Sequence, residues 1–67
     1  MNLHKSALLT RCKTVCEGID IEVPSLMKTR PGLTPDQQNE LNRVISGLRQ
    51  TQSDLRLLIK SLENAPQ

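Results

Sequence analysis

The feature that most constrains this chain is the regular spacing of apolar residues in its second half. Between residues 34 and 64 they recur in alternating steps of three and four, with one glutamine in the series. This spacing places them on one face of an α-helix, in the pattern of a heptad seam. We predict that the seam forms an oligomer interface. Its residues are Leu41, Ile45, Leu48, Gln52, Leu55, Ile59 and Leu62.

The two ends of this helix are also marked in the sequence. Thr34 is a suitable N-cap, Pro35 suits the first helical position, and Gln37 can complete a capping box with Thr34. Pro66 cannot continue a helix. The pattern therefore predicts a helix over residues 34–64.

The first half of the chain carries a shorter helical pattern, over residues 2–17, with Gly18 as its C-terminal signal. Apolar and acidic residues then alternate over 19–23, which indicates an extended segment ended by Pro24. We expect a connector over residues 18–33. The fold class predicted for residues 1–67 is one small all-α domain: a helical hairpin with a short first helix, an extended connector and a long heptad-patterned second helix.

The predicted lengths do not match. At 1.5 Å per residue the second helix is about 46 Å long and the first about 24 Å. The first helix would then cover only half of the second and leave an apolar overhang, which is typical of an interface. We therefore expect the hairpin to oligomerise, as a dimer or higher, into a helical bundle.

Two residues in this overhang are candidates for binding a partner protein. Leu57 lies opposite the seam and Leu58 widens the apolar stripe. The polar residue within the seam, Gln52, has two interpretations. It fixes the helix register at a cost in stability, or it lies where the seam is solvated.

Composition limits the other classes of function. The chain has 67 residues, no aromatic residue and a net charge of +2. It offers no aromatic ring to stack on a nucleobase, which disfavours the binding of single-stranded nucleic acid by stacking. A basic patch is the alternative route to a nucleic acid or small anion, although charged residues usually form a solvated face. The candidate anion-binding residues are Lys5, Arg11, Lys13, Lys28 and Arg30.

His4, Cys12 and Cys16 are the residues with metal-binding or nucleophilic chemistry. A single C-x3-C and one histidine do not make a typical zinc set, so we interpret the cysteines as reduced, buried packing residues. The sequence contains no catalytic motif. We expect no enzyme activity, no metal and no cofactor.

One short segment resembles a known family. Leu33-Thr34 followed by Leu41-Asn42-Arg43-Val44 is similar to the start of the hairpin in phage proteins that sequester cyclic nucleotides. The aromatic residue that this family places ahead of the Leu-Thr pair has no counterpart here. The resemblance implies an oligomer that sequesters a small anion or a cyclic nucleotide.

The sequence thus favours a small non-enzymatic interaction protein, a regulator, adaptor or inhibitor of the kind that phages and plasmids encode. It would bind a partner protein through an apolar helical surface. A nucleic-acid-binding helical bundle and a nucleotide-sequestering oligomer are the alternatives. With no apolar run near the length of a membrane span, we expect a cytoplasmic location.

Overall fold

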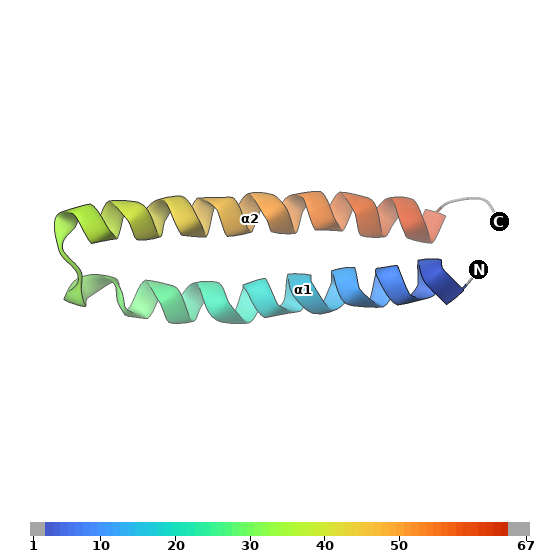
Figure 1. Ribbon diagram of the computed structural model, residues 1–67, viewed down its shortest axis with the longest axis horizontal. Helices are drawn as coiled ribbons and strands as arrows, with labels where there is room; N and C mark the ends of the chain where they lie inside the picture. The colour runs from blue at the N-terminus through green and yellow to red at the C-terminus, as the bar shows by residue number, and fades with distance from the viewer. Residues whose placement is uncertain (1–2, 65–67) are drawn as a thin grey trace.

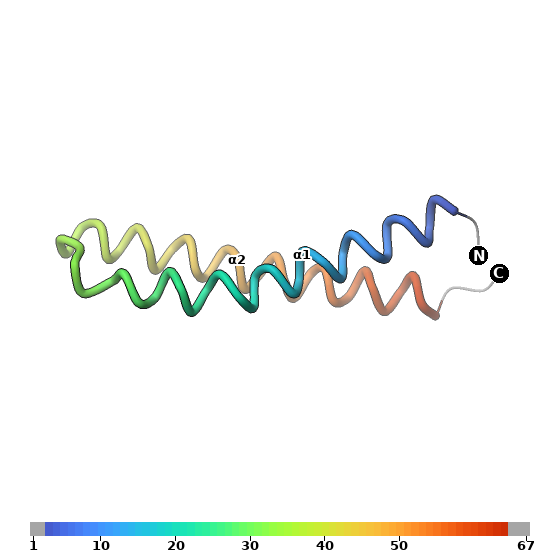
Figure 2. Tube along the Cα trace, turned by 90° about the horizontal axis from the view of Figure 1, so that it is seen from below, coloured from blue at the N-terminus to red at the C-terminus, as the bar shows by residue number. Residues whose placement is uncertain are grey.

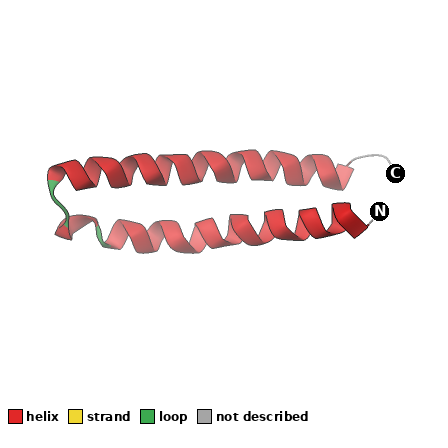
Figure 3. Cartoon of the chain, in the orientation of Figure 1, coloured by secondary structure: helices red, strands yellow, loops and turns green. Residues whose placement is uncertain are grey.

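The computed structural model describes residues 3–64, and their regular structure is entirely helical (Figure 3). Helix α1 spans Leu3–Lys28, the 3-10 helix η1 spans Arg30–Gly32, and helix α2 spans Pro35–Asn64. The two long helices lie side by side and antiparallel, so the start of α1 and the end of α2 lie at the same end (Figure 1). In the perpendicular view their traces cross near the middle (Figure 2). The predicted all-α hairpin is confirmed.

The predicted end of the first helix at residue 17 is wrong, as is the extended connector over 18–33. Helix α1 continues to Lys28, and residues 19–23 lie within it. Ile19 and Val23 are four residues apart and both are buried, which suits a helix as well as a strand. Ile21 separates the two interpretations, because its side chain is 67% exposed. A half-buried strand would bury Ile21 on the same face as Ile19 and Val23.

Pro24 lies inside α1 and does not end it. A proline within a helix removes one backbone hydrogen bond and disfavours the preceding turn, at a cost of about 3 kcal/mol. The segment stays helical because Val23 and Leu26, on either side of Pro24, turn inward toward α2. Burial of this face outweighs the local preference of the proline.

The predicted overhang of the second helix is therefore also wrong. Helix α1 has 26 residues and α2 has 30, which correspond to about 39 and 45 Å. Leu55, Ile59 and Leu62 are half-buried along α1 rather than left facing water. The length mismatch consequently gives no support to oligomerisation.

The turn is held by side chains on both sides of it. The Thr34 N–H donates to Gln37 Oε1 at 3.0 Å, and the Gln37 N–H donates to Thr34 Oγ1 at 3.2 Å, which confirms the predicted capping box. The Gln38 amide donates to the carbonyls of Arg30 and Leu33. These contacts fix the angle at which the chain enters α2.

The core is a thin seam between the two helices. Cys12, Cys16, Ile19 and Val23 are buried along α1, at steps of four, three and four residues. The facing apolar residues of α2 are half-buried, and among the described residues of α2 only Gln52 is fully buried. The residues predicted for an oligomer interface thus pack between two helices of the same chain. Those half-buried residues are Leu41, Ile45, Leu48, Leu55, Ile59 and Leu62.

Candidate interaction surface

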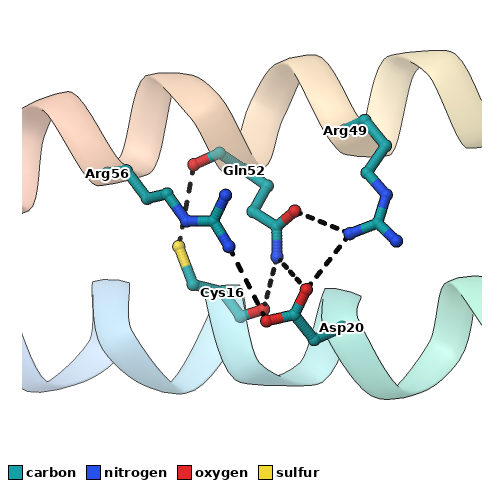
Figure 4. A network of polar contacts seen from close by, with 5 residues as sticks. All are labelled: Cys16, Asp20, Arg49, Gln52 and Arg56. Carbon is teal, nitrogen blue, oxygen red and sulfur yellow. Dashed lines mark hydrogen bonds and ion pairs between the residues drawn. The ribbon is translucent and has the colours of Figure 1, made fainter.

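Gln52 lies at the centre of the hairpin and is 1% exposed, so the interpretation of a solvated seam is wrong. Its amide Nε2 donates to the Cys16 carbonyl at 3.0 Å and to Asp20 Oδ1 at 2.7 Å (Figure 4). Its Oε1 accepts a hydrogen bond from Arg49 at 2.9 Å. Only this orientation of the amide points its donors at acceptors and its acceptor at a donor. The buried polar side chain is therefore fully satisfied.

One further contact joins the helices at the same level. The Cys16 thiol donates to the backbone carbonyl of Gln52, with 3.8 Å between the sulfur and the oxygen. The carbonyl of Cys16 has a second lone pair besides the one used within α1, so it accepts the Gln52 amide without leaving the helical ladder. The pairing of Cys16 with Gln52 is reciprocal. A slide of one helix along the other would leave the buried Gln52 amide without its acceptor on α1, so this pair opposes such a slide.

Asp20 connects this buried centre to the surface. Its carboxylate accepts from the Gln52 amide and from Arg49 at 3.1 Å, and it lies 3.7 Å from Arg56. The hydrogen bond from Gln52 lowers the pKa of Asp20 below its ordinary value of 3.8, and the two arginines lower it further, against an opposing desolvation. The structure thus favours the ionised carboxylate.

All three ion pairs given by the structure for the described residues join α1 to α2 on one side of the seam. Lys13 pairs with Glu63 at 3.0 Å, and Asp20 pairs with both arginines of α2. Residues 13 and 20 are seven apart on α1, and residues 49, 56 and 63 are seven apart on α2. A spacing of seven keeps them on the same side of each helix. We call this side the ion-paired face; its residues are Lys13, Asp20, Arg49, Arg56 and Glu63.

The opposite side of the seam carries apolar residues at the same spacing. Leu8 and Val15 are seven apart on α1, with Glu22 at the next step, and Val44 and Leu58 are two such steps apart on α2, with Thr51 between them. The four apolar side chains are 40–51% exposed. Each of these four residues directly precedes a residue that is turned toward the other helix. In an antiparallel pair, such positions on the two helices lie on the same side of the seam, so the four residues share one face. We call Leu8, Val15, Val44 and Leu58 the apolar face.

Leu58 and Leu57 were the residues predicted to bind a partner, and the structure separates them. Leu58 belongs to the apolar face. Leu57 is one residue away, about 100° around the helix, and is 67% exposed on the outer side of α2. Both are accessible, but they do not form one surface.

The basic residues predicted to bind an anion do not share one side of the molecule. Arg11 and Lys13 lie about 200° apart around α1. Lys13 is also paired with Glu63. Arg30 lies in η1, near the turn, far along the chain from Lys5 near the start of α1. Their arrangement does not provide the continuous basic stripe that phosphate backbones favour.

The cysteines are packing residues. Cys12 and Cys16 are free thiols, buried in the seam, while His4 is exposed near the start of α1. Within residues 3–64, no group of three metal-binding side chains lies close enough to hold an ion. No helix in this part of the chain has the length and apolar character needed to cross a membrane.

The fold and its surface define a class, an antiparallel two-helix hairpin with one ion-paired and one apolar face. The comparisons with known proteins add no family to this description: no family model, curated protein or solved structure matches the chain.

Sequence reasoning missed the partners of Gln52. Asp20 was placed in an extended segment and no role was assigned to Arg49 or Arg56, so the meeting of these three residues went unnoticed. The spacing of seven between Arg49 and Arg56, on the flank of the seam opposite Val44 and Leu58, is the signal that predicts a polar face.

Proposed function

We propose that this protein is a small, non-enzymatic interaction protein that binds another polypeptide through its apolar face. The observation that carries the proposal is the asymmetry of the hairpin. One side of the seam is closed by three ion pairs between the helices, whereas the other exposes aliphatic side chains from both helices. Exposed aliphatic side chains gathered on one side of a small protein are typical of a binding site.

The chemistry of the apolar face indicates what it binds. Leu8, Val15, Val44 and Leu58 offer aliphatic carbon without a hydrogen-bonding group. Such a surface gains free energy by excluding water, and an amphipathic helix offers a matching stripe of side chains. Anionic ligands need donors, which this face lacks. The hypotheses of nucleic acid binding and nucleotide sequestration stay predictions that no feature of this face favours.

The experiment uses two adjacent leucines as a matched pair. The purified chain is immobilised and the polypeptides that it retains, including added free chain, are quantified for wild type, Leu58→Glu and Leu57→Glu. We expect Leu58→Glu to reduce retention about tenfold or more, as loss of a central aliphatic contact does, and Leu57→Glu to change it little. Circular dichroism serves as the folding control for both variants.

Equal retention by all three proteins would refute the proposed function. A loss on Leu57→Glu alone would move the binding surface to the outer side of α2. Retention that falls steeply with salt and is insensitive to Leu58 would favour the nucleic acid alternative instead.

A further inference from the structure

We propose that the polypeptide bound by the apolar face is a second copy of this chain, so that two hairpins pack face to face as a dimer of four helices. This inference rests on the proposed function and names its partner. It does not rely on an overhang of α2, which the structure lacks.

The exposed area of the chain is the first argument. The solvent-accessible surface is 5174 Å², whereas a compact monomer of 7.5 kDa exposes about 4,200 Å². The excess, roughly 900 Å², is close to the ~800 Å² that each partner contributes to a stable interface of standard size. Covering one face of the hairpin would bring its exposed area per chain to that of an ordinary folded protein.

The shape of the chain points the same way. The radius of gyration is 15.5 Å, while a compact domain of 67 residues has about 11 Å. The hairpin measures 51 × 15 × 13 Å, which is one layer of two helices. A helix in such a layer has a neighbour on only one side, and helical domains normally bury their apolar stripes between at least two layers.

The width of the apolar stripe suits a second layer. On α2 the inward residues are joined on one flank by Val44 and Leu58, and on α1 by Leu8 and Val15. A stripe widened on one flank is typical of a helix in a four-helix bundle, which contacts two neighbours. Both helices are widened on the flank that faces away from the ion pairs. A second hairpin laid on this side contacts α1 and α2 together.

Two glycines on the same side have no role within one chain. Gly18 lies three residues after Val15, and Gly47 three residues after Val44, so each shares the side of the apolar face. A Cβ built at either position meets no atom of the other helix within 4 Å. Glycine inside a helix costs about 0.5–1 kcal/mol relative to alanine. A second backbone that approaches closely here gives these residues a use.

A second copy also supplies a surface that matches the apolar face, without any other component. A twofold axis pairs the same surface with itself, so each contact occurs twice. Leu8, Val15, Val44 and Leu58 carry no charge, and the exposed Glu22, one heptad step after Val15, lies at the edge of this face. The ion-paired face stays in solvent on both outer sides of the assembly.

Sedimentation equilibrium over micromolar to millimolar concentrations tests the inference. We expect the wild type to approach twice its chain mass of 7.5 kDa. The double variant Val15→Glu/Leu58→Glu replaces four aliphatic side chains in the dimer, so it should weaken association about ten-thousandfold, or tenfold per side chain. The matched control Ile21→Glu/Leu57→Glu makes the same change at two outer positions, each 67% exposed, and should associate like wild type.

Circular dichroism serves as the folding control, and if the first double variant unfolds, Val44→Glu replaces it at a half-exposed position. A wild type that stays monomeric throughout, an assembly of more than two chains, or equal disruption by the control would each overturn the inference. A monomer that nevertheless retains another polypeptide in a Leu58-dependent manner leaves the proposed function standing. A monomer that retains none refutes both.

Discussion

Replacing Gln52 tests the balance between hydrogen bonding and burial at the centre of the hairpin. The variants are Gln52→Leu and Gln52→Ala. Either one removes the bonds to the Cys16 carbonyl, to Asp20 and from Arg49. The question is whether any of these partners is left buried and unsatisfied.

The surroundings of each partner indicate that no partner is left buried without a hydrogen bond. The side chains of Asp20 and Arg49 are 54% and 47% exposed, so they keep their own pair and gain water. The Cys16 carbonyl keeps its bond within α1. The three lost bonds therefore cost about 2 kcal/mol together, near the low end for intramolecular hydrogen bonds. A buried leucine side chain returns about 2–3 kcal/mol.

We thus expect Gln52→Leu to be as stable as wild type or up to about 1 kcal/mol more stable, which raises the melting temperature by up to about 4–8 °C for a chain of this size. Gln52→Ala lacks the compensating burial and leaves a cavity, so it should lose about 2–4 kcal/mol. Urea and thermal unfolding followed by circular dichroism, at one chain concentration, give both values. A second readout is the pKa of Asp20, which should rise toward its ordinary value in both variants because its main hydrogen bond is gone.

A loss of more than about 1 kcal/mol in Gln52→Leu would refute this reasoning, because it would mean that a partner remains buried without a bond. Equal stability of the leucine and alanine variants would show that the site is not packed against α1.

Three further predictions follow from individual contacts. Since the folded pKa of Asp20 is lowered, its contribution to stability is complete above its ordinary value of 3.8 and is lost as the pH falls through the lowered folded pKa; Asp20→Asn should therefore flatten the acid limb of a plot of unfolding free energy against pH. Pro24→Ala should stabilise the chain by about 1–3 kcal/mol in urea unfolding, because α1 regains a backbone hydrogen bond, and a loss of stability would show that the proline relieves a clash in this helix. Cys12→Ala and Cys16→Ala should each cost about 1 kcal/mol as buried packing residues, while a chelator should leave the unfolding curve unchanged; stoichiometric zinc with unfolding by chelator would contradict this.

Local chemistry in the sequence predicted the second helix well. Thr34 and Gln37 are three residues apart, so their capping contacts do not depend on the rest of the fold. The 3–4 spacing of apolar residues identified the face of α2 that is turned inward. These signals are local, and local signals can be read from one sequence.

The first helix was only half predicted, because the apolar residues at its centre fit both the two-residue repeat of a strand and the 3.6-residue repeat of a helix. Ile19 and Val23 satisfy both a strand and a helix, and Pro24 looks like a terminator unless the burial of Val23 is known. Only packing against α2 resolves this ambiguity, and that contact lies about thirty residues away in the chain. The mistaken length of α1 then produced the mistaken overhang.

The candidate surface was predicted only in part, since it depends on which flank of each helix the other leaves open. Leu58 was named, but the residues of α1 that share its face can be identified only from the register of the hairpin. That register is fixed by the reciprocal contact of Cys16 with Gln52, which no short-range pattern reveals.

The most direct test of the account is to measure which methyl groups water reaches in solution. A soluble paramagnetic agent broadens the NMR signals of exposed methyls. We predict that Val15, Val44 and Leu58 become protected as the chain concentration rises from micromolar to millimolar, while Ile21 and Leu57 stay accessible throughout. Equal accessibility of all five residues at every concentration would contradict the claim that a second copy covers the apolar face.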